Sequence, residues 1–273
     1  MLIFSDKVLY VSDLDGTLLL PNEKLSEFTR NALNDMIGQG MYFSYATARS
    51  FVTASKVTSG LNAQFPAIVY NGAFIVDNKT NEMLLANYFH PDDIVIIRNL
   101  LAEAQIFPIV YAHINGAEKF SSYRANAKVR GFLATRKGDV RENSASDIDE
   151  LYSGKVFYFT CIDADEKLAP AYEALRDKYH CIFHKDIYTG DRWLEILPPN
   201  ATKATAMRKL KAHLHCDRIV AFGDGKNDLS MFQIADECYA VENAVAELKA
   251  LATGVIGSNT EDGVVKWLRQ NAR

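Results

Sequence analysis

Cysteine is scarce in this chain of 273 residues, which contains only four. None of the four forms a Cys-x-x-Cys pair, so their spacing indicates neither a zinc site nor a disulfide framework. We interpret them as free thiols that are buried in the protein. They are Cys161, Cys181, Cys216 and Cys238.

Long apolar runs and an excess of positive charge are missing as well. No segment approaches the roughly 20 apolar residues that a membrane-spanning helix needs, and residues 1–6 lack the basic start and apolar run of a secretory signal. Lys and Arg number 30 against 34 Asp and Glu, and the formal net charge of -4 offers nucleic acid or a membrane surface no bulk attraction. We therefore expect a cytoplasmic monomer or small homo-oligomer whose partner is a small molecule, with no nucleic acid and no membrane.

The chain does have the alternating pattern of an α/β protein. Short apolar segments that end abruptly in polar residues are typical of buried parallel strands, and segments with helical spacing stand between them. The pattern predicts strands at 7–12, 41–46 and 67–70 and helices at about 25–37 and 49–59. Each strand, helix and strand in succession implies a right-handed crossover, so we expect a doubly wound, Rossmann-like parallel sheet.

This alternation of strands and helices changes near residue 73, where a hairpin is predicted over 74–85 in place of a crossover. A separate α+β module is then indicated by strands at 106–112, 155–162 and 181–184 and by helices at 91–101 and 167–178. The alternation typical of a parallel sheet resumes with strands at 218–222 and 238–241 and helices at 202–215, 228–235 and 263–271. We predict a core formed by 1–83 and 190–273, and an inserted α+β domain at 84–189.

Two carboxylates, Asp13 and Asp15, follow the first predicted strand, with Gly16 and Thr17 directly after them. Open parallel sheets bind ligands at the carboxyl ends of their strands, so this position suits a functional site. One carboxylate there could hold a divalent cation and attack phosphorus, while the other moves protons. A solvated Asp-Gly turn is the structural alternative, and the specificity of the pattern favours function.

A second acidic cluster, Asp224 and Asp228, follows the predicted strand at 218–222 and opens a helix. Its Gly-x-Gly segment is similar to the start of a dinucleotide-binding loop, but Asp228 stands where that loop needs a third Gly. Hard oxygen ligands from a few carboxylates are what Mg²⁺ prefers. Seen alone, the cluster could equally cap a helix, but together with the first acidic pair it favours metal binding.

Thr47 and Lys203 lie at two further element ends, a strand end and the first turn of a helix. The Thr47 hydroxyl can donate to a phosphoryl oxygen, and the Lys203 ammonium can neutralise the charge of a transferring phosphoryl group. A Thr at a strand end is commonly structural and a single Lys is commonly solvated, so their meaning depends on the order of all the motifs.

The order of these motifs resembles the haloacid dehalogenase (HAD) superfamily, and within it the Cof-type, sugar-phosphatase-like branch. The motifs are, in order, Asp13-x-Asp15-Gly16-Thr17, Thr47, Lys203 and Gly223-Asp224-Gly225-x-Asn227-Asp228. The resemblance spans the chain, and segments 70–73 and 193–198 are also similar to segments common in this branch. One departure is visible, because Ala204 stands where the family usually has Gly.

The resemblance implies a role for each of these residues. Asp13 would form an aspartyl-phosphate, and Asp15 would protonate the leaving oxygen and later activate water. Mg²⁺ would bind Asp13, Asp224 and the main-chain carbonyl of Asp15, with Asp228 in the surrounding shell. The inserted domain would be an α/β cap that selects the substrate. The phosphate would lie against the Leu14 main chain and the side chains of Thr47, Lys203 and Asn227.

We therefore expect a Mg²⁺-dependent phosphatase, a phosphoric monoester hydrolase, that acts on a small metabolite such as a sugar phosphate, FMN or pyridoxal phosphate. Asp15 favours hydrolysis over dehalogenation, because a dehalogenase needs no acid at that position. A phosphomutase and a non-catalytic protein that binds a phosphometabolite remain alternatives. A signalling receiver domain does not fit, because such a domain is shorter and has no inserted module.

Overall fold

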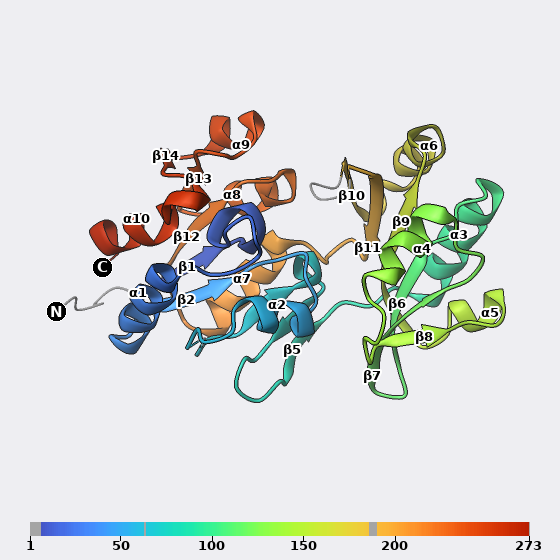
Figure 1. The fold of residues 1–273 in the computed structure, drawn as a ribbon, viewed down its shortest axis with the longest axis horizontal. Coiled ribbons are helices and arrows are strands. Elements are labelled where there is room, and N and C mark those ends of the chain that lie inside the picture. The colour runs from blue at the N-terminus through green and yellow to red at the C-terminus, as the bar shows by residue number, and fades with distance from the viewer. Residues whose placement is uncertain (1–6, 63, 186–189, 273) are drawn as a thin grey trace. The chain divides into compact units, whose positions relative to one another are not determined.

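The computed structural model describes residues 7–62, 64–185 and 190–272, and the chain divides into two compact units. The first unit contains the described residues up to Ala86 and those from Ala201 onward, and the second contains Asn87–Asn200. The chain thus leaves the first unit once and returns to it, as the colours of Figure 1 show. Residues 1–6, on which the prediction about a secretory signal rests, lie outside the described residues. In the described ranges no helix is both long and apolar enough to cross a bilayer.

A five-stranded parallel sheet forms the centre of the first unit, with the strand order β14-β13-β12-β1-β2. All five residues of its interior strand β1 are buried. Because successive residues of a strand point to opposite faces, both faces of the sheet are covered at β1. The strands are β1 (Val8–Ser12), β2 (Tyr42–Tyr45), β12 (Arg218–Gly223), β13 (Glu237–Val241) and β14 (Gly254–Ile256).

A three-stranded antiparallel sheet continues the first unit beyond β2. It contains β3 (Ala67–Val69), β4 (Phe74–Val76) and β5 (Met83–Ala86). An isolated parallel bridge between Ala46 and Ile68 joins it to the end of β2. The pairing of β4 with β5 confirms the hairpin predicted over 74–85.

The helices of the first unit form two groups, because α1 contacts α10 whereas α7 contacts α8 and α8 contacts α9. Hydroxyl caps fix three of their first turns, since Ser26, Ser50 and Thr202 each accept a hydrogen bond from the main-chain N–H three residues on. The Thr202 cap fixes the turn in which Lys203 stands. The helices are α1 (Glu27–Gly38), α2 (Phe51–Val57), α7 (Lys203–His213), α8 (Leu229–Phe232), α9 (Ala246–Leu251) and α10 (Gly263–Asn271).

A six-stranded sheet of order β10-β11-β9-β6-β7-β8 forms the second unit, and all its pairs are antiparallel except β7 with β8. Its strands are β6 (Ile109–Ile114), β7 (Ala117–Ser122), β8 (Glu142–Ser144), β9 (Lys155–Asp163), β10 (His180–Lys185) and β11 (Arg192–Leu197). Its helices are α3 (Pro91–Glu103), α4 (Ala127–Ala134), α5 (Ile148–Leu151) and α6 (Asp165–Leu175).

Helices cover both faces of this second sheet. One buried cluster packs Ile97 of α3 and Leu168 of α6 around Val110 of β6. A smaller cluster packs Val129 of α4 around Ile109, the neighbour of Val110 on the same strand. Adjacent strand residues face opposite sides, so α4 lies on the side opposite to α3 and α6. The second unit therefore has a hydrophobic core of its own.

The predicted boundaries of the inserted domain, 84–189, need correction. The strand β5 stays with the first unit, and β11, which we predicted in the core, belongs to the second. β11 lies between β9 and β10 and pairs with both, so its backbone groups are satisfied within the second sheet. Its apolar pattern fits a strand of either sheet, which is why the sequence did not distinguish them.

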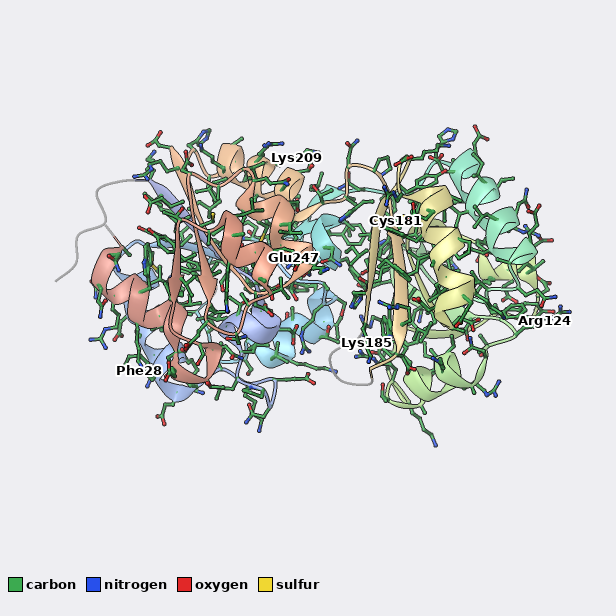
Figure 2. The ribbon with its side chains drawn as sticks, turned by 90° about the horizontal axis from the view of Figure 1, so that it is seen from above. Phe28, Arg124, Cys181, Lys185, Lys209 and Glu247 are labelled. Carbon is green, nitrogen blue, oxygen red and sulfur yellow. The ribbon has the colours of Figure 1, made fainter. Side chains whose placement is uncertain are left out.

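The four cysteines are free thiols, as predicted. Cys161, Cys216 and Cys238 are buried, but Cys181 on β10 is only half-buried, so the prediction of burial is wrong for that residue. Figure 2 labels Cys181 among the side chains of the second unit.

Candidate active site

The candidate site lies within the first unit, where three neighbouring strands of the parallel sheet end. Asp13 follows β1, Thr47 comes two residues after β2, and Asp224 follows β12. The Asp13 main-chain N–H donates to the Phe222 carbonyl at 2.9 Å, which continues the pairing of β1 with β12 into the site. Because parallel strands end at one edge of a sheet, residues from distant parts of the chain meet there.

Lys203 joins two of the acids. Its ammonium donates to Oδ1 of Asp13 at 2.6 Å and to Oδ1 of Asp228 at 2.7 Å. The side chains of Lys203 and Asp228 are fully buried, and that of Asp13 is 7% exposed. Charges so deeply buried are tolerated only when they are paired. Among the described residues, Lys203 is the only side chain that hydrogen-bonds the Asp13 carboxylate, and it engages a single oxygen.

Burial and the neighbouring charges shift the pKa values of Asp13, Asp224 and Lys203. Burial raises the pKa of Asp13 well above its usual value, and the charges of Asp228 and Asp224 raise it further against the opposing effect of Lys203. Burial also raises the pKa of Asp224 to about 7, with Asp228 as the next cause. Burial alone would lower the pKa of Lys203, but Asp13 and Asp228 raise it. Three carboxylates thus share one ammonium in a poorly solvated site.

Asp224 and Asp228 have different partners although they are four residues apart. Asp228 Oδ2 accepts the main-chain N–H groups of Asp224 and Gly225, both at 3.0 Å, while its Oδ1 accepts from Lys203. Asp228 therefore has both oxygens engaged and shapes the loop after β12. Asp224 Oδ1 accepts the Thr17 hydroxyl at 2.7 Å.

Gly16 allows the loop after β1 to pack directly on Asp224. A Cβ at Gly16 would lie 2.4 Å from Asp224 Oδ2, and the φ of Gly16 is +78°, so both space and backbone conformation require glycine. Asn243 Nδ2 donates to the Gly16 carbonyl at 2.7 Å and holds this loop from the other side. The two acidic segments are thus fixed against each other.

The clustered acids form a group that fits a metal ion. Asp13, Asp224 and Asp228 each offer one oxygen within 4.8 Å of the others. Their hard oxygens and their excess of negative charge over Lys203 suit a divalent cation. Asp13 and Asp224 are the more available ligands, because both oxygens of Asp228 already accept hydrogen bonds. The Asp15 carbonyl, a predicted main-chain ligand, belongs to the loop that packs on Asp224.

The Asp15 side chain has a different partner, Arg49, which no motif had singled out. Arg49 Nε donates to Asp15 Oδ2 at 2.7 Å, and Arg49 Nη2 donates to Asp15 Oδ1 at 2.5 Å. The same Nη2 also donates to Glu23 Oε2 at 2.8 Å. The Asp15 side chain is 24% exposed, unlike that of Asp13.

Thr47 and Asn227, two predicted phosphate-binding residues, are linked through Asn71. The Asn71 main-chain N–H donates to the Thr47 carbonyl at 2.9 Å, and its Oδ1 accepts from Asn227 Nδ2 at 3.2 Å. The Thr47 hydroxyl oxygen accepts the Arg49 main-chain N–H at 3.1 Å, so its proton remains to be donated. Leu14, whose main chain is a further predicted phosphate-binding group, is fully buried.

Sequence reasoning assigned no role to Thr17, Glu23, Arg49 or Asn71. Thr17 is part of the first motif, Arg49 stands two residues after Thr47, and Asn71 lies in a segment that resembles the family, and these are the signals that could have identified them. The side-chain hydrogen bonds of these residues join positions that are between 26 and 207 residues apart in the chain, and no spacing rule predicts such contacts.

A family model described as a haloacid dehalogenase-like hydrolase matches residues 10–268. The chain belongs to this family. The match confirms the predicted resemblance and the prediction of a hydrolase, and the parallel sheet confirms the predicted fold class.

Curated relatives of this HAD hydrolase extend over almost its whole length. One is 5-amino-6-(5-phospho-D-ribitylamino)uracil phosphatase YitU of Bacillus subtilis, which is 26% identical, with 94% of this chain and 95% of the relative covered. Another is 5-amino-6-(5-phospho-D-ribitylamino)uracil phosphatase YwtE of the same organism, at 28% identity, with 94% and 96% covered. Relatives with phosphatase names accord with the prediction of a phosphoric monoester hydrolase.

Solved structures with the same fold also cover nearly the whole chain. TM0651 from Thermotoga maritima has a TM-score of 0.79 at 26% identity, with 98% of both chains covered. A haloacid dehalogenase-like hydrolase from Bacteroides thetaiotaomicron has a TM-score of 0.78 at 22% identity, with 97% of this chain and 99% of the other covered. The second likeness concerns the fold alone.

Proposed function

We propose that this HAD hydrolase is a Mg²⁺-dependent phosphatase that cleaves a small phosphorylated metabolite through an aspartyl-phosphate on Asp13. The observation that carries the proposal is the buried group of Asp13, Lys203 and Asp228, with Asp224 beside it. Lys203 engages Oδ1 of Asp13, and we assign the attack on phosphorus to Oδ2. The buried ammonium also supplies positive charge where the equatorial oxygens of the phosphoryl group gather charge.

In the first half-reaction, the Asp13 carboxylate forms a bond to phosphorus while the bond from phosphorus to the ester oxygen breaks. The electron pair of the broken bond stays on the ester oxygen, which takes a proton from Asp15. Thr47 and Asn227 are the proposed donors to the phosphoryl oxygens, together with the Leu14 main chain. The alcohol then leaves, and the phosphoryl group remains on Asp13.

In the second half-reaction, Asp15 accepts a proton from water as the water oxygen attacks phosphorus. The bond between phosphorus and Asp13 breaks, and its electron pair returns to the Asp13 carboxylate. Inorganic phosphate is released with Asp15 again protonated, so the cycle closes without another reagent. Bound Mg²⁺ would neutralise charge on the phosphoryl group and on the acids, and Asp13, Asp224 and the Asp15 carbonyl are its proposed ligands.

We propose the second unit as the cap that selects the substrate. The names of the two Bacillus relatives suggest a phosphorylated ribityl compound as the first substrate to test. Sugar phosphates, FMN and pyridoxal phosphate belong in the same screen, because each presents a phosphate monoester on a small polar molecule.

The decisive experiment measures phosphate release from these compounds with Mg²⁺, by the wild type and by Asp13→Asn. The variant is expected to release none while keeping the wild-type circular dichroism spectrum. Asp35→Asn is the matched control, because Asp35 is exposed on α1 of the same unit. Substantial Mg²⁺-dependent turnover by Asp13→Asn would overturn the proposal. Isomerised sugar phosphate in the presence of a bisphosphate activator would instead favour a phosphomutase.

A further inference from the structure

Arg49 holds Asp15 through both carboxylate oxygens. The two hydrogen bonds, 2.7 Å from Nε to Oδ2 and 2.5 Å from Nη2 to Oδ1, form a planar fork that fixes the orientation of the carboxylate as well as its position. The backbone of Asp15 is not helical, because its φ of -73° and ψ of 122° are extended and Gly16 after it has a positive φ. The fork therefore constrains a side chain that its own backbone leaves adjustable.

Arg49 is in turn anchored at both ends. Its main-chain N–H donates to the Thr47 hydroxyl oxygen at 3.1 Å, and its carbonyl accepts the Tyr70 N–H at 2.9 Å. At the guanidinium end, Nη2 also donates to Glu23 at 2.8 Å. The arginine side chain is 16% exposed, so most of its length is enclosed.

The Glu23 contact uses an unfavourable backbone conformation. Glu23 has a φ of +59°, which non-glycine residues adopt rarely, in a tight turn closed by hydrogen bonds between Leu20 and both Glu23 and Lys24. Such outliers persist where the surrounding structure favours them and are common at functional sites. Here the turn presents a carboxylate to Nη2 of Arg49.

We infer that Arg49 is a positioning residue for Asp15, with Glu23 as its second anchor, an inference that rests on the proposed function of Asp15 as the proton donor and acceptor. The fork keeps the carboxylate aimed at the ester oxygen and at the attacking water. The role differs from that of a substrate-binding arginine, because Nε and Nη2 already bond to carboxylates of the protein itself. It also differs from a purely structural tie, which would not distinguish between leaving groups.

The test compares two substrates of similar shape, p-nitrophenyl phosphate and benzyl phosphate. p-Nitrophenolate leaves without a proton, whereas the benzyl alkoxide needs one, so in the half-reaction that forms the aspartyl-phosphate only benzyl phosphate depends strongly on Asp15. Misplacement of a catalytic group by about 1 Å can cost about 100-fold in rate. The later hydrolysis of the aspartyl-phosphate also uses Asp15 but is common to both substrates, so kcat/KM, which reports only the first half-reaction, is the quantity to compare. We therefore expect Arg49→Met to lower kcat/KM for benzyl phosphate by about 10- to 100-fold and kcat/KM for p-nitrophenyl phosphate far less.

A double-mutant cycle with Asp15→Asn completes the experiment. If Arg49 acts through Asp15, adding Arg49→Met to Asp15→Asn causes no further loss with benzyl phosphate. Arg49→Lys, which keeps the charge but cannot form the fork, and Glu23→Gln should each show a smaller loss with the same preference for benzyl phosphate. These two variants carry the test if Arg49→Met does not fold. Arg30→Met, at a half-buried arginine on α1, is the control and should leave both rates unchanged.

Three results would overturn the inference. One is an equal loss of kcat/KM with both substrates, another is a further loss of kcat/KM in the Asp15→Asn background, and the third is a raised KM at unchanged kcat, which would mark Arg49 as a substrate ligand. Release of phosphate from both compounds by the wild type but not by Asp13→Asn supports the proposed function independently. A failed cycle would then count against the role of Arg49 alone.

Discussion

Thr17 is the hydrogen-bond donor that distinguishes Asp224 from the other acids of the cluster. Asp13 and Asp228 are both paired with Lys203, whereas Asp224 Oδ1 accepts only a neutral hydroxyl, at 2.7 Å. That hydrogen bond lowers the pKa of Asp224, against the burial that raises it to about 7. Asp224 is therefore the acid whose charge most needs a cation, and Thr17 prepares it to bind one.

Thr17→Val should weaken Mg²⁺ activation, because it removes this hydrogen bond while keeping the volume of the side chain. Hydrogen bonds to charged groups contribute about 1.5–3 kcal/mol, so we expect the Mg²⁺ concentration for half-maximal activity to rise by about tenfold or more. Loss of the hydroxyl raises the pKa of Asp224 further, and protons compete with the metal below that pKa. The rise should therefore be larger at pH 6 than at pH 8 in Mg²⁺ titrations of phosphate release.

Thr29→Val is the matched control for this prediction. The Thr29 hydroxyl also donates to an aspartate, Asp262, at 2.9 Å, but it joins α1 to the start of α10 instead of serving the site. It should lower the free energy of unfolding without changing the Mg²⁺ requirement. An equal change in Mg²⁺ requirement for both variants would contradict the role of Thr17.

At the same scale, the sequence identified the residues that bear charge at strand ends but not those that hold them. Asp13 and Asp224 directly follow predicted strands, so the rule that parallel strands end at one edge was enough to bring them together, and Lys203 stands in the first turn of a predicted helix. The contacts of Arg49 and Asn71 with the site depend on the directions in which their side chains point from two loops. These directions follow from backbone angles, such as the φ of +51° at Asn71, which residue patterns do not specify.

At the scale of elements, Gly72 sets how closely the turn after β3 approaches α7. A Cβ there would lie 2.2 Å from the Thr202 carbonyl oxygen and 2.8 Å from the Lys203 nitrogen, and the φ of Gly72 is +97°. Gly72→Ala should therefore push away the first turn of α7, which carries Lys203. We expect a loss in free energy of unfolding, measured with urea, of about 1–2 kcal/mol from the backbone and about 1–3 kcal/mol from the clash. Lower kcat for phosphate release should accompany it.

Gly40→Ala separates these two contributions. Gly40 has a φ of +101°, but a Cβ there would meet no atom within 4 Å. This variant should lose only the backbone contribution, about 1–2 kcal/mol, and should keep wild-type kcat. Equal destabilisation by the two substitutions, or wild-type kcat in Gly72→Ala, would show that α7 is not displaced.

The elements themselves were predictable where apolar periodicity was strong and unpredictable where it was weak. Strand β1 and helix α10 follow the predicted segments 7–12 and 263–271 closely. The elements that went unpredicted in the second unit are β7, α4, β8, α5 and β11. The burial pattern of β8, with no buried residue, shows why: its pairing with β7 uses backbone hydrogen bonds that leave no apolar signal.

At the scale of the whole molecule, the insertion was predictable but its exact limits were not. A change from crossovers to a hairpin marks the place where the chain is about to leave the first unit, yet the hairpin strand β5 still belongs to that unit, in its three-stranded sheet. On the return path, β11 pairs with β9 and β10 of the second sheet. The strands with which a strand pairs decide to which unit it belongs, and the sequence of one strand does not specify its pairing partners.

The two units have separate cores, and each contains one of the two tryptophans of the chain. Trp267 packs on Tyr239 in the first unit, and Trp193 packs on Phe132 in the second. The proposed metal ligands belong to the first unit alone. Because a ligand stabilises the unit that binds it, Mg²⁺ should raise the unfolding midpoint reported by Trp267 and have a smaller effect on that reported by Trp193.

Trp193→Phe and Trp267→Phe isolate the two fluorescence signals for this measurement. At a Mg²⁺ concentration of about 100 times its Kd, binding adds about 2.7 kcal/mol to the stability of the binding unit, so the urea midpoint of Trp193→Phe should rise clearly relative to EDTA. Adding Asp224→Asn should abolish that rise, because it removes a proposed ligand. Identical urea midpoints and identical Mg²⁺ shifts from both tryptophans would mean that the chain unfolds in one cooperative transition. The prediction that the two units differ in stability would then be wrong.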